Sequence, residues 1–201
     1  TGRVIVLEKM ARPGRKIMIT GKGRCNFTNV KPWNEFSGHI YPKPNFLKPS
    51  FYNLNPEKMI EFLEDYGMES AVERGDRAFP TSHLASDVVD ALLRAAQQNG
   101  TEVLCNKEVK SIIHKEDSYS IKCSDGCEYT SGKLIIATGG LSYPKTGSTG
   151  DGYRFAKETG HGFVETFPSL VPFVTKETWC RDVMGLSLKN ISVELTQGKK
   201  Q

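Results

Sequence analysis

The chain has 201 residues, 38% of them hydrophobic and 25% charged, with a formal net charge of +4. This length can hold one substantial core, or one domain and part of a second. The mild charge lacks the concentrated positive surface of a typical nucleic-acid binder, no apolar run approaches the roughly 20 residues that span a bilayer, and there is no signal-peptide pattern. We therefore expect a cytoplasmic protein with neither nucleic acid nor a membrane as its partner.

The five cysteines include no C-x-x-C pair. Structural zinc sites need denser clusters of Cys and His, so we expect no metal site. Cys123 and Cys127 flank a Ser-Asp-Gly turn. Because cytosolic thiols stay reduced, we expect no disulfide between them.

The first element is a continuous apolar run over residues 4–7, which ends in Glu8. Such a run is typical of a parallel strand buried on both faces. A carboxylate that closes the second strand of a dinucleotide-binding βαβ unit holds the adenosine ribose through its hydroxyls. We interpret Glu8 as this carboxylate; the alternative is an ordinary surface acid.

Residues 14–29 combine glycines, basic side chains and a short polar tail. Glycines let a ligand approach the backbone, Arg and Lys attract anions, and the tail can hydrogen-bond to ring edges or hydroxyls. The alternative is a solvated basic loop. Together with Glu8, the candidate cofactor-binding residues of this region are Lys9, Arg15, Lys16, Thr20, Gly21, Gly23, Arg24, Cys25, Asn26, Thr28 and Asn29.

Residues 8–9, 13–16 and 20–29 resemble a family of bacterial FAD-dependent oxidoreductases grouped with aminoacetone oxidase and the bile-acid dehydro-reductases. The resemblance extends to about residue 195. It implies FAD as the cofactor, with Glu8 on the ribose and the segment 15–29 around the pyrophosphate and flavin. The glycine turn of a dinucleotide-binding unit should precede the ribose acid by roughly 20 residues. We therefore expect a longer protein, with a βα unit before Thr1.

Residues 30–55 are rich in prolines and aromatics without periodicity, which predicts an ordered excursion. A helix should begin at Pro56, with Asn55 as its N-cap, and end at Gly67. Residues 73–86 predict a turn, a short extended piece and a helix start. They also resemble the family's Gly-Arg-x-Phe-Pro-x-Ser segment, with departures that concern substrate contacts. A second helix is expected over residues 86–98.

Strands are predicted at residues 102–105, 109–113, 119–123 and 133–138, with a hairpin turn at 124–126. The first and last of these should lie parallel to residues 4–7 in one sheet. The family layout implies backbone contacts from Val109 near the adenine, and a cofactor path along Thr138, Gly139 and Gly140. The alternative for the last two is that Gly-Gly merely ends a strand.

Residues 147–152 are typical of a phosphate-cradling loop but lack the G-K-[ST] of an ATPase. Asp151 is expected to cap the helix that follows. We predict an α/β fold: a Rossmann-like FAD-binding domain over residues 1–162, with a parallel sheet, helices and a β-meander. Residues 163–201 should begin a β-barrel-like second domain, with strands at 186–188 and 191–195.

The predicted function is oxidoreduction through FAD, with a small organic molecule as substrate and NADH or NADPH as a candidate electron donor. Cys25 lies near the isoalloxazine or, as the favoured alternative, is a packed bystander. His83 and His161 are candidates for proton transfer, although surface or capping roles are favoured, and no catalytic residue is assigned. Alternatives are a non-catalytic flavoprotein scaffold and, less favoured, a nucleic-acid-binding basic loop. The oligomeric state stays open.

Overall fold

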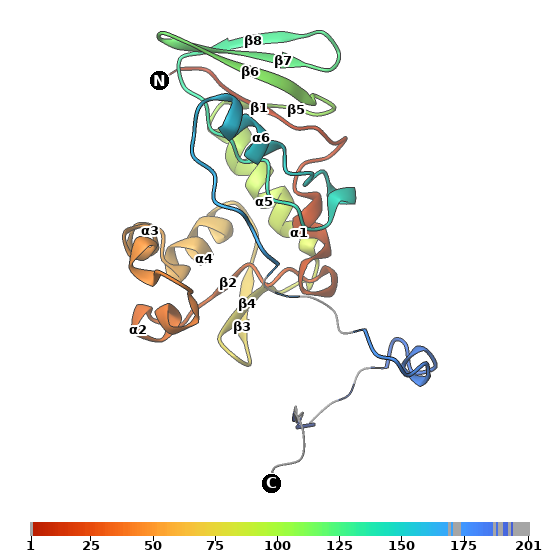
Figure 1. Cartoon of the computed structure of the whole chain (residues 1–201). Coiled ribbons are helices and arrows are strands. Elements are labelled where there is room, and N and C mark those ends of the chain that lie inside the picture. Colours follow the sequence, from red (N-terminus) through yellow and green to blue (C-terminus); the bar gives the residue numbers. More distant parts are fainter. Residues whose placement is uncertain are drawn as a thin grey trace. The chain divides into compact units, whose positions relative to one another are not determined.

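The computed structural model of the chain, shown in Figure 1, describes residues 2–168, 170, 174–186, 188, 191–192 and 194. Its first strand, β1 (Val4–Leu7), pairs in parallel with β5 (Thr101–Leu104), with Val4 opposite Thr101 and Leu7 opposite Leu104. Between them the chain passes through α5 (Ala85–Gln98), which packs against β5. A mixed α/β fold with a parallel sheet is thereby confirmed.

The helix α5 follows its sequence pattern closely. Its buried residues recur at helical spacing, and Gly100 follows the helix in a left-handed conformation (φ +73°). On β1, however, Val4 and Val6 are 53% and 41% exposed. The prediction that this strand is buried on both faces is wrong: Val4 and Val6 share one face and are exposed, and the residues of the other face, Ile5 and Leu7, are half-buried.

The predicted strand at residues 133–138 is also wrong. The structure shows this segment without regular secondary structure, and Ile135 is 89% exposed. A β-strand is stabilised by hydrogen bonds to a neighbouring strand, and no described strand pairs with these residues. The parallel sheet of the described residues therefore has two strands, β1 and β5, rather than the predicted three.

The β-meander is confirmed. β6 (Val109–Lys115), β7 (Ser118–Cys123) and β8 (Glu128–Ser131) pair antiparallel in that order, with the predicted hairpin turn between the last two. Ile112, Ile121 and Cys123 are buried in it. Cys127 is a free thiol, like every other cysteine of the described structure.

A small antiparallel sheet was not predicted. It has the order β2 (Thr28–Asn29), β4 (Arg77–Pro80) and β3 (Ser70–Glu73). The excursion between β2 and β3 contains α2 (Trp33–Phe36) and α3 (Lys48–Asn53). It is followed by α4 (Pro56–Asp65), which begins as predicted, with the Asn55 side chain accepting from the Lys58 amide at 2.9 Å. The strands of this small sheet have only two to four residues, too few to show a clear alternation of apolar and polar side chains in the sequence.

Two further helices complete the first unit. The short helix α1 (Arg15–Ile19) replaces part of the predicted loop, and α6 (Asp151–Glu158) follows the glycine-rich loop. Asp151 is the first helical residue of α6 and Gly150 is the N-cap, so the predicted capping role of Asp151 is wrong. The main core joins Cys25, Leu63, Met68, Ala85, Val88 and Ala91.

The chain divides into two compact units, Thr1–Phe163 and Val164–Gln201. In the second unit, the described residues include one short 3₁₀ helix, Trp179–Arg181. Of the strands predicted at residues 186–188 and 191–195, residues 187, 193 and 195 lie outside the described residues, and the described ones have no regular secondary structure. The β-rich character of this unit stays a prediction. No helix in the described part of the chain is long and apolar enough to cross a membrane.

Candidate functional site

Glu8 lies where β1 ends, at the carboxyl edge of the parallel pair. Its backbone is held by β5 and the turn after it: the Glu8 amide donates to the Leu104 oxygen at 2.9 Å, and its oxygen accepts from Lys107 at 2.8 Å. The Oε1 atom of Glu8 accepts from the Met10 amide at 2.7 Å. Its other carboxylate oxygen has no partner among the described residues and can accept from a ligand hydroxyl.

Lys9 joins this strand end to the start of α6. Its Nζ atom donates to Thr149 Oγ1 at 2.8 Å and to Asp151 Oδ2 at 3.0 Å. Burial acts to raise the pKa of Asp151, but hydrogen bonds from Thr149 and Lys9 outweigh it, so the pKa lies below its ordinary value. The charge of Lys9 is therefore committed to a protein partner, and its main effect is to hold two loops together.

The segment of Thr138, Gly139 and Gly140 lies beside α1. At Gly139 (φ +73°) a Cβ atom would be 2.8 Å from Ser148 Oγ and 3.8 Å from Lys16 Nζ. Lys16 Nζ is itself 3.5 Å from Ser142 Oγ. The ammonium group therefore lies next to a backbone stretch that only glycine can form at this spacing. A cation beside an accessible backbone suits an anionic ligand.

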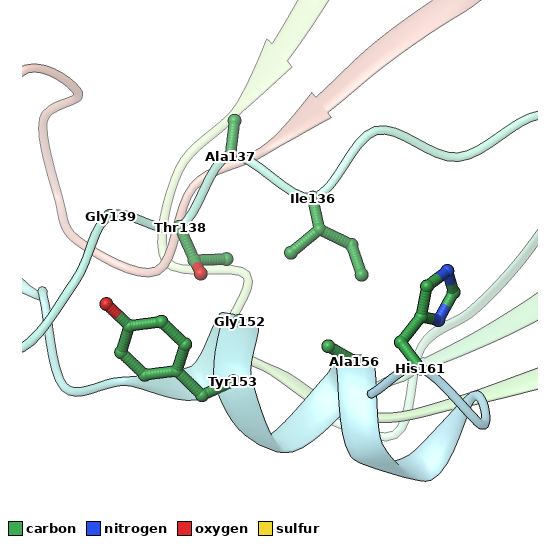
Figure 2. A pocket seen from close by; sticks show the side chains of 8 residues that line it. All are labelled: Ile136, Ala137, Thr138, Gly139, Gly152, Tyr153, Ala156 and His161. Atoms are coloured by element: carbon green, nitrogen blue, oxygen red, sulfur yellow. The ribbon is translucent and has the colours of Figure 1, made fainter. Parts of the chain in front are cut away.

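Thr138 and Gly139 of this segment line a pocket of about 320 Å³. Figure 2 shows Tyr153 and His161 on opposite sides of this pocket, with Thr138 and Ile136 between them. A Cβ atom on Gly152 would meet Thr138 Oγ1 at 2.7 Å, so the absence of a side chain lets α6 approach the segment closely. The pocket offers hydroxyl and imidazole groups in an otherwise apolar lining.

The loop of residues 20–29 is wound tightly. Gly21, Lys22, Gly23 and Cys25 all have positive φ, and the Cys25 amide donates back to the Thr20 oxygen at 3.1 Å. Non-glycine residues in this conformation cost free energy and persist where their surroundings require it. Here the Cys25 side chain, only 4% exposed, anchors the loop in the main core.

Several predicted ligand-binding side chains of this loop have protein partners. Arg24 forms an ion pair with Glu73, donates from Nε to His83 Nδ1 at 3.2 Å, and lies 4.3 Å from the centroid of the Phe79 ring. Glu73 was not recognised from the sequence, because it is far from Arg24 along the chain and carries no motif. The charge of Arg24 is thus largely balanced within the protein.

The polar tail is similarly occupied. Burial raises the pKa of the Cys25 thiol, and a hydrogen bond with Thr20 lowers this pKa by a smaller amount, so it lies above its ordinary value. The Asn26 amide, in the orientation that satisfies its neighbours, donates to the Thr28 and Ala78 oxygens at 2.8 and 3.2 Å. Asn29 donates to the Gly75 oxygen at 2.9 Å and accepts from the Lys31 amide at 3.1 Å. These groups fix the turn onto the small sheet.

Hydrogen bonds from Lys9 to Thr149 and Asp151 join the strand end at Glu8 to the loop before α6. In the same loop Ser148 lies beside Gly139, which in turn lies beside Lys16. The predicted residues from Thr20 to Asn29 lie beyond the other end of α1, and Arg15 is exposed on that helix. Val109 begins β6, opposite Cys123.

The family model for the HI0933-like protein Rossmann domain matches residues 1–201. The chain belongs to this family. Its curated relatives include the ribosomal RNA dihydrouridine synthases of Escherichia coli (30% identical, 85% of this chain, 42% of the relative) and Haemophilus influenzae (27%, 96%, 47%). The 3-dehydro-bile acid delta(4,6)-reductase of Clostridium scindens is 27% identical over 87% of this chain and 42% of its own length.

This HI0933-like chain thus spans less than half the length of these relatives. The family resemblance expected from the sequence is confirmed, and the reductase among the relatives supports a flavoprotein oxidoreductase in general terms. A solved structure of tetracycline destructase Tet(51) is 19% identical, with a TM-score of 0.27, and covers 43% of this chain and 27% of its own. That likeness is too small to add to the argument.

The residues at the end of β1 fit a dinucleotide such as FAD. Glu8 has a carboxylate oxygen without a described partner for a ribose hydroxyl, and Lys16 supplies a positive charge beside Gly139. A Cβ atom on Gly140 would also lie 3.2 Å from the Tyr153 hydroxyl, so a side chain would narrow this path. An acceptor, a cation and exposed backbone are the groups that a ribose and a pyrophosphate require.

Proposed function

We propose that this chain is the dinucleotide-binding part of a FAD-dependent oxidoreductase that saturates a carbon–carbon double bond. The observation that carries the proposal is the strand-end carboxylate of Glu8 with the Lys16 ammonium beside the Gly139 backbone. The names of the relatives supply the reaction class: forming dihydrouridine saturates a double bond of the uracil ring, and a delta(4,6)-reductase saturates double bonds of a bile acid.

In this proposal the residues bind and orient the cofactor. The second oxygen of Glu8 accepts from the ribose hydroxyls, while Lys16 and Arg15 offset the charge of the pyrophosphate. Gly139 and Gly140 allow the dinucleotide to lie against the backbone. Bound flavin supplies hydride transfer, with NADH or NADPH as the source of the electrons. The turn at residues 20–29 shapes the flavin side through its backbone, since most of its side chains are occupied.

The test uses the protein expressed from its complete gene. We expect a yellow protein whose flavin absorbance bleaches anaerobically with NADH or NADPH, and returns when a substrate with a reducible double bond is added. Ribosomal RNA and a 3-dehydro-bile acid are the two substrates to compare. A colourless protein that binds no added FAD would contradict the proposal and favour a non-catalytic scaffold. If oxygen reoxidises the reduced flavin but neither of these two substrates does, double-bond reduction is contradicted.

A further inference from the structure

A second pocket lies outside the dinucleotide site, within residues 31–58, which comprise most of the predicted excursion and the start of α4. It has a volume of about 420 Å³, and three aromatic side chains line it: Trp33 from α2, and Phe51 and Tyr52 from α3. The Trp33 ring centroid is 5.2 Å from that of Phe51 and 6.3 Å from that of Tyr52. None of these residues was assigned a role from the sequence.

The aromatic cluster is accessible. Tyr52 is 58% exposed, whereas Phe51 is backed by Phe36 with their centroids 5.3 Å apart. Phe51 and Tyr52 meet edge to face, at 85°. The backing of Phe36 fixes one side of the cluster and leaves the Tyr52 ring available on the other. An exposed ring held on a rigid support offers a face on which a planar group can stack.

The polar rim of the pocket favours a ligand with hydrogen-bonding edges. Lys31, Asn34 and Glu57 line it together with the rings. A nucleobase has an aromatic face and an edge of donors and acceptors, which an amide and a carboxylate can meet. A steroid ring system has apolar faces without such edges, so these three side chains would gain little from it.

The stretch of chain that carries the pocket has a charge that complements a phosphate backbone. Residues 31–58 contain four lysines, Lys31, Lys43, Lys48 and Lys58, against two acids, Glu35 and Glu57. Lys43 and Lys48 are exposed and form no ion pair within the described residues. Stacking aromatics combined with such cations are the two features that bind single-stranded nucleic acid without strong sequence preference. The mild net charge of the whole chain conceals this local excess.

The pocket is also joined to the loop assigned to the flavin side. Asn29 ends β2, and its Oδ1 atom accepts from the backbone amide of Lys31 at 3.1 Å. Lys31 Nζ in turn contacts Glu35 at 2.8 Å and Asp76 at 3.2 Å, which ties the pocket wall to the turn before β4. A nucleic-acid strand bound in this pocket would therefore lie next to the elements that flank the proposed flavin site.

We propose that this aromatic pocket binds an unpaired base of an RNA strand, with Lys43 and Lys48 on its phosphates. The inference rests on the proposed function and names RNA as the substrate class of that reductase. It replaces the expectation that no nucleic acid binds. The names of two relatives, both acting on ribosomal RNA, agree with it.

The test measures the binding of a fluorescein-labelled oligouridine to the protein from its complete gene, at several salt concentrations. Y52A should bind roughly five- to a hundredfold more weakly, the loss typical of one stacked base, with an unchanged salt slope. Y52F should bind like the wild type. K48A should reduce the slope of log K against log[salt] by about 0.7. Y129A and K115A, on the meander, are the matched controls.

A second readout uses intrinsic fluorescence. Trp33 lines the pocket, so we expect oligouridine to quench part of the tryptophan fluorescence of the wild type, and we expect W33F to lose this quenching. Quenching by a 3-dehydro-bile acid and not by RNA, or equal RNA affinity in Y52A and wild type, would overturn the proposal. RNA binding by a flavin-free protein would refute the oxidoreductase alone, whereas a yellow protein without RNA affinity would refute the RNA pocket alone.

Discussion

The end of β1 and the loop of residues 20–29 carry the same kinds of residue, glycines, cations and short polar side chains, yet the structure uses them differently. At the end of β1, one oxygen of Glu8 has no described partner and Lys16 Nζ lies beside the Gly139 backbone. In the loop, Arg24 pairs with Glu73, and Cys25 lies in the core. A motif thus indicates which residues are special, while their distant partners decide whether they are available to a ligand.

The largest expected effect concerns α1, which connects the two regions. Gly14, before α1, has φ +72°, and a Cβ atom there would be 2.8 Å from a Val89 methyl carbon in α5. We expect Gly14→Ala to lower the free energy of unfolding by about 2–4 kcal/mol, combining a left-handed alanine with an overpacked core. Urea unfolding measures it.

Gly126→Ala is the matched control for this change. Gly126 has φ +85°, but a Cβ atom there would meet nothing within 4 Å. Only the backbone cost of about 1–2 kcal/mol should remain. If both variants lose the same free energy of unfolding, α1 is not packed tightly on α5. In that case α1 does not hold the end of β1 and the loop of residues 20–29 in place.

Cys25→Ser sharpens the structural side of the comparison. The new hydroxyl would replace a buried thiol among apolar side chains, which should cost about 1–3 kcal/mol of unfolding free energy. Cys105→Ser, at a half-buried site, should cost less. FAD affinity should not change. Weaker FAD binding without a loss of stability would instead assign the thiol to the ligand site.

Asp151→Asn should have the smallest effect, on the side of the ligand site. Removing the ion pair with Lys9 should lower the free energy of unfolding by about 0.5–1 kcal/mol at neutral pH. Because the pKa of Asp151 is lowered by Thr149 and Lys9 against the opposing effect of burial, the carboxylate stabilises the fold above its unfolded pKa. This contribution is lost as the pH falls through the lowered pKa.

The two unfolding curves of wild type and Asp151→Asn should therefore converge in acid. Asp90→Asn is the control, since the Arg12–Asp90 pair has a similar N···O distance of 2.8 Å but is nearly half exposed on both side chains. Exposed pairs contribute little. A constant difference between Asp151→Asn and wild type from neutral to acid pH would exclude the ion pair as the cause.

Elements with a strong local pattern were predictable. The apolar period of α5, the Asn-Pro start of α4 and the hairpin of the meander each depend on residues close in sequence. The strand prediction for residues 133–138 was wrong because an apolar run forms a β-strand only where a neighbouring strand can pair with it. The Arg24–Glu73 ion pair escaped prediction because neither residue type specifies a partner far away in the chain.

The candidate site was predictable to the extent that backbone conformation specified it. Gly139 was singled out as a glycine that lets the backbone lie against a cofactor, and in the structure it has a φ of +73°, a conformation that favours glycine. That Lys16 would lie beside it, and that Asn29 would be used to hold the Lys31 amide, depends on how α1 and the small sheet pack. No local pattern encodes that packing.

The most direct test of the comparison is the dissociation constant of FAD for Glu8→Gln and Arg24→Ala in the complete gene product, measured by flavin fluorescence. Glu8→Gln keeps an oxygen for the Met10 amide but replaces the other acceptor by a donor, so FAD should bind about ten- to a hundredfold more weakly, or 1.5–3 kcal/mol. Arg24→Ala should leave the constant unchanged while lowering stability. Unchanged affinity in Glu8→Gln together with weaker binding in Arg24→Ala would contradict the account.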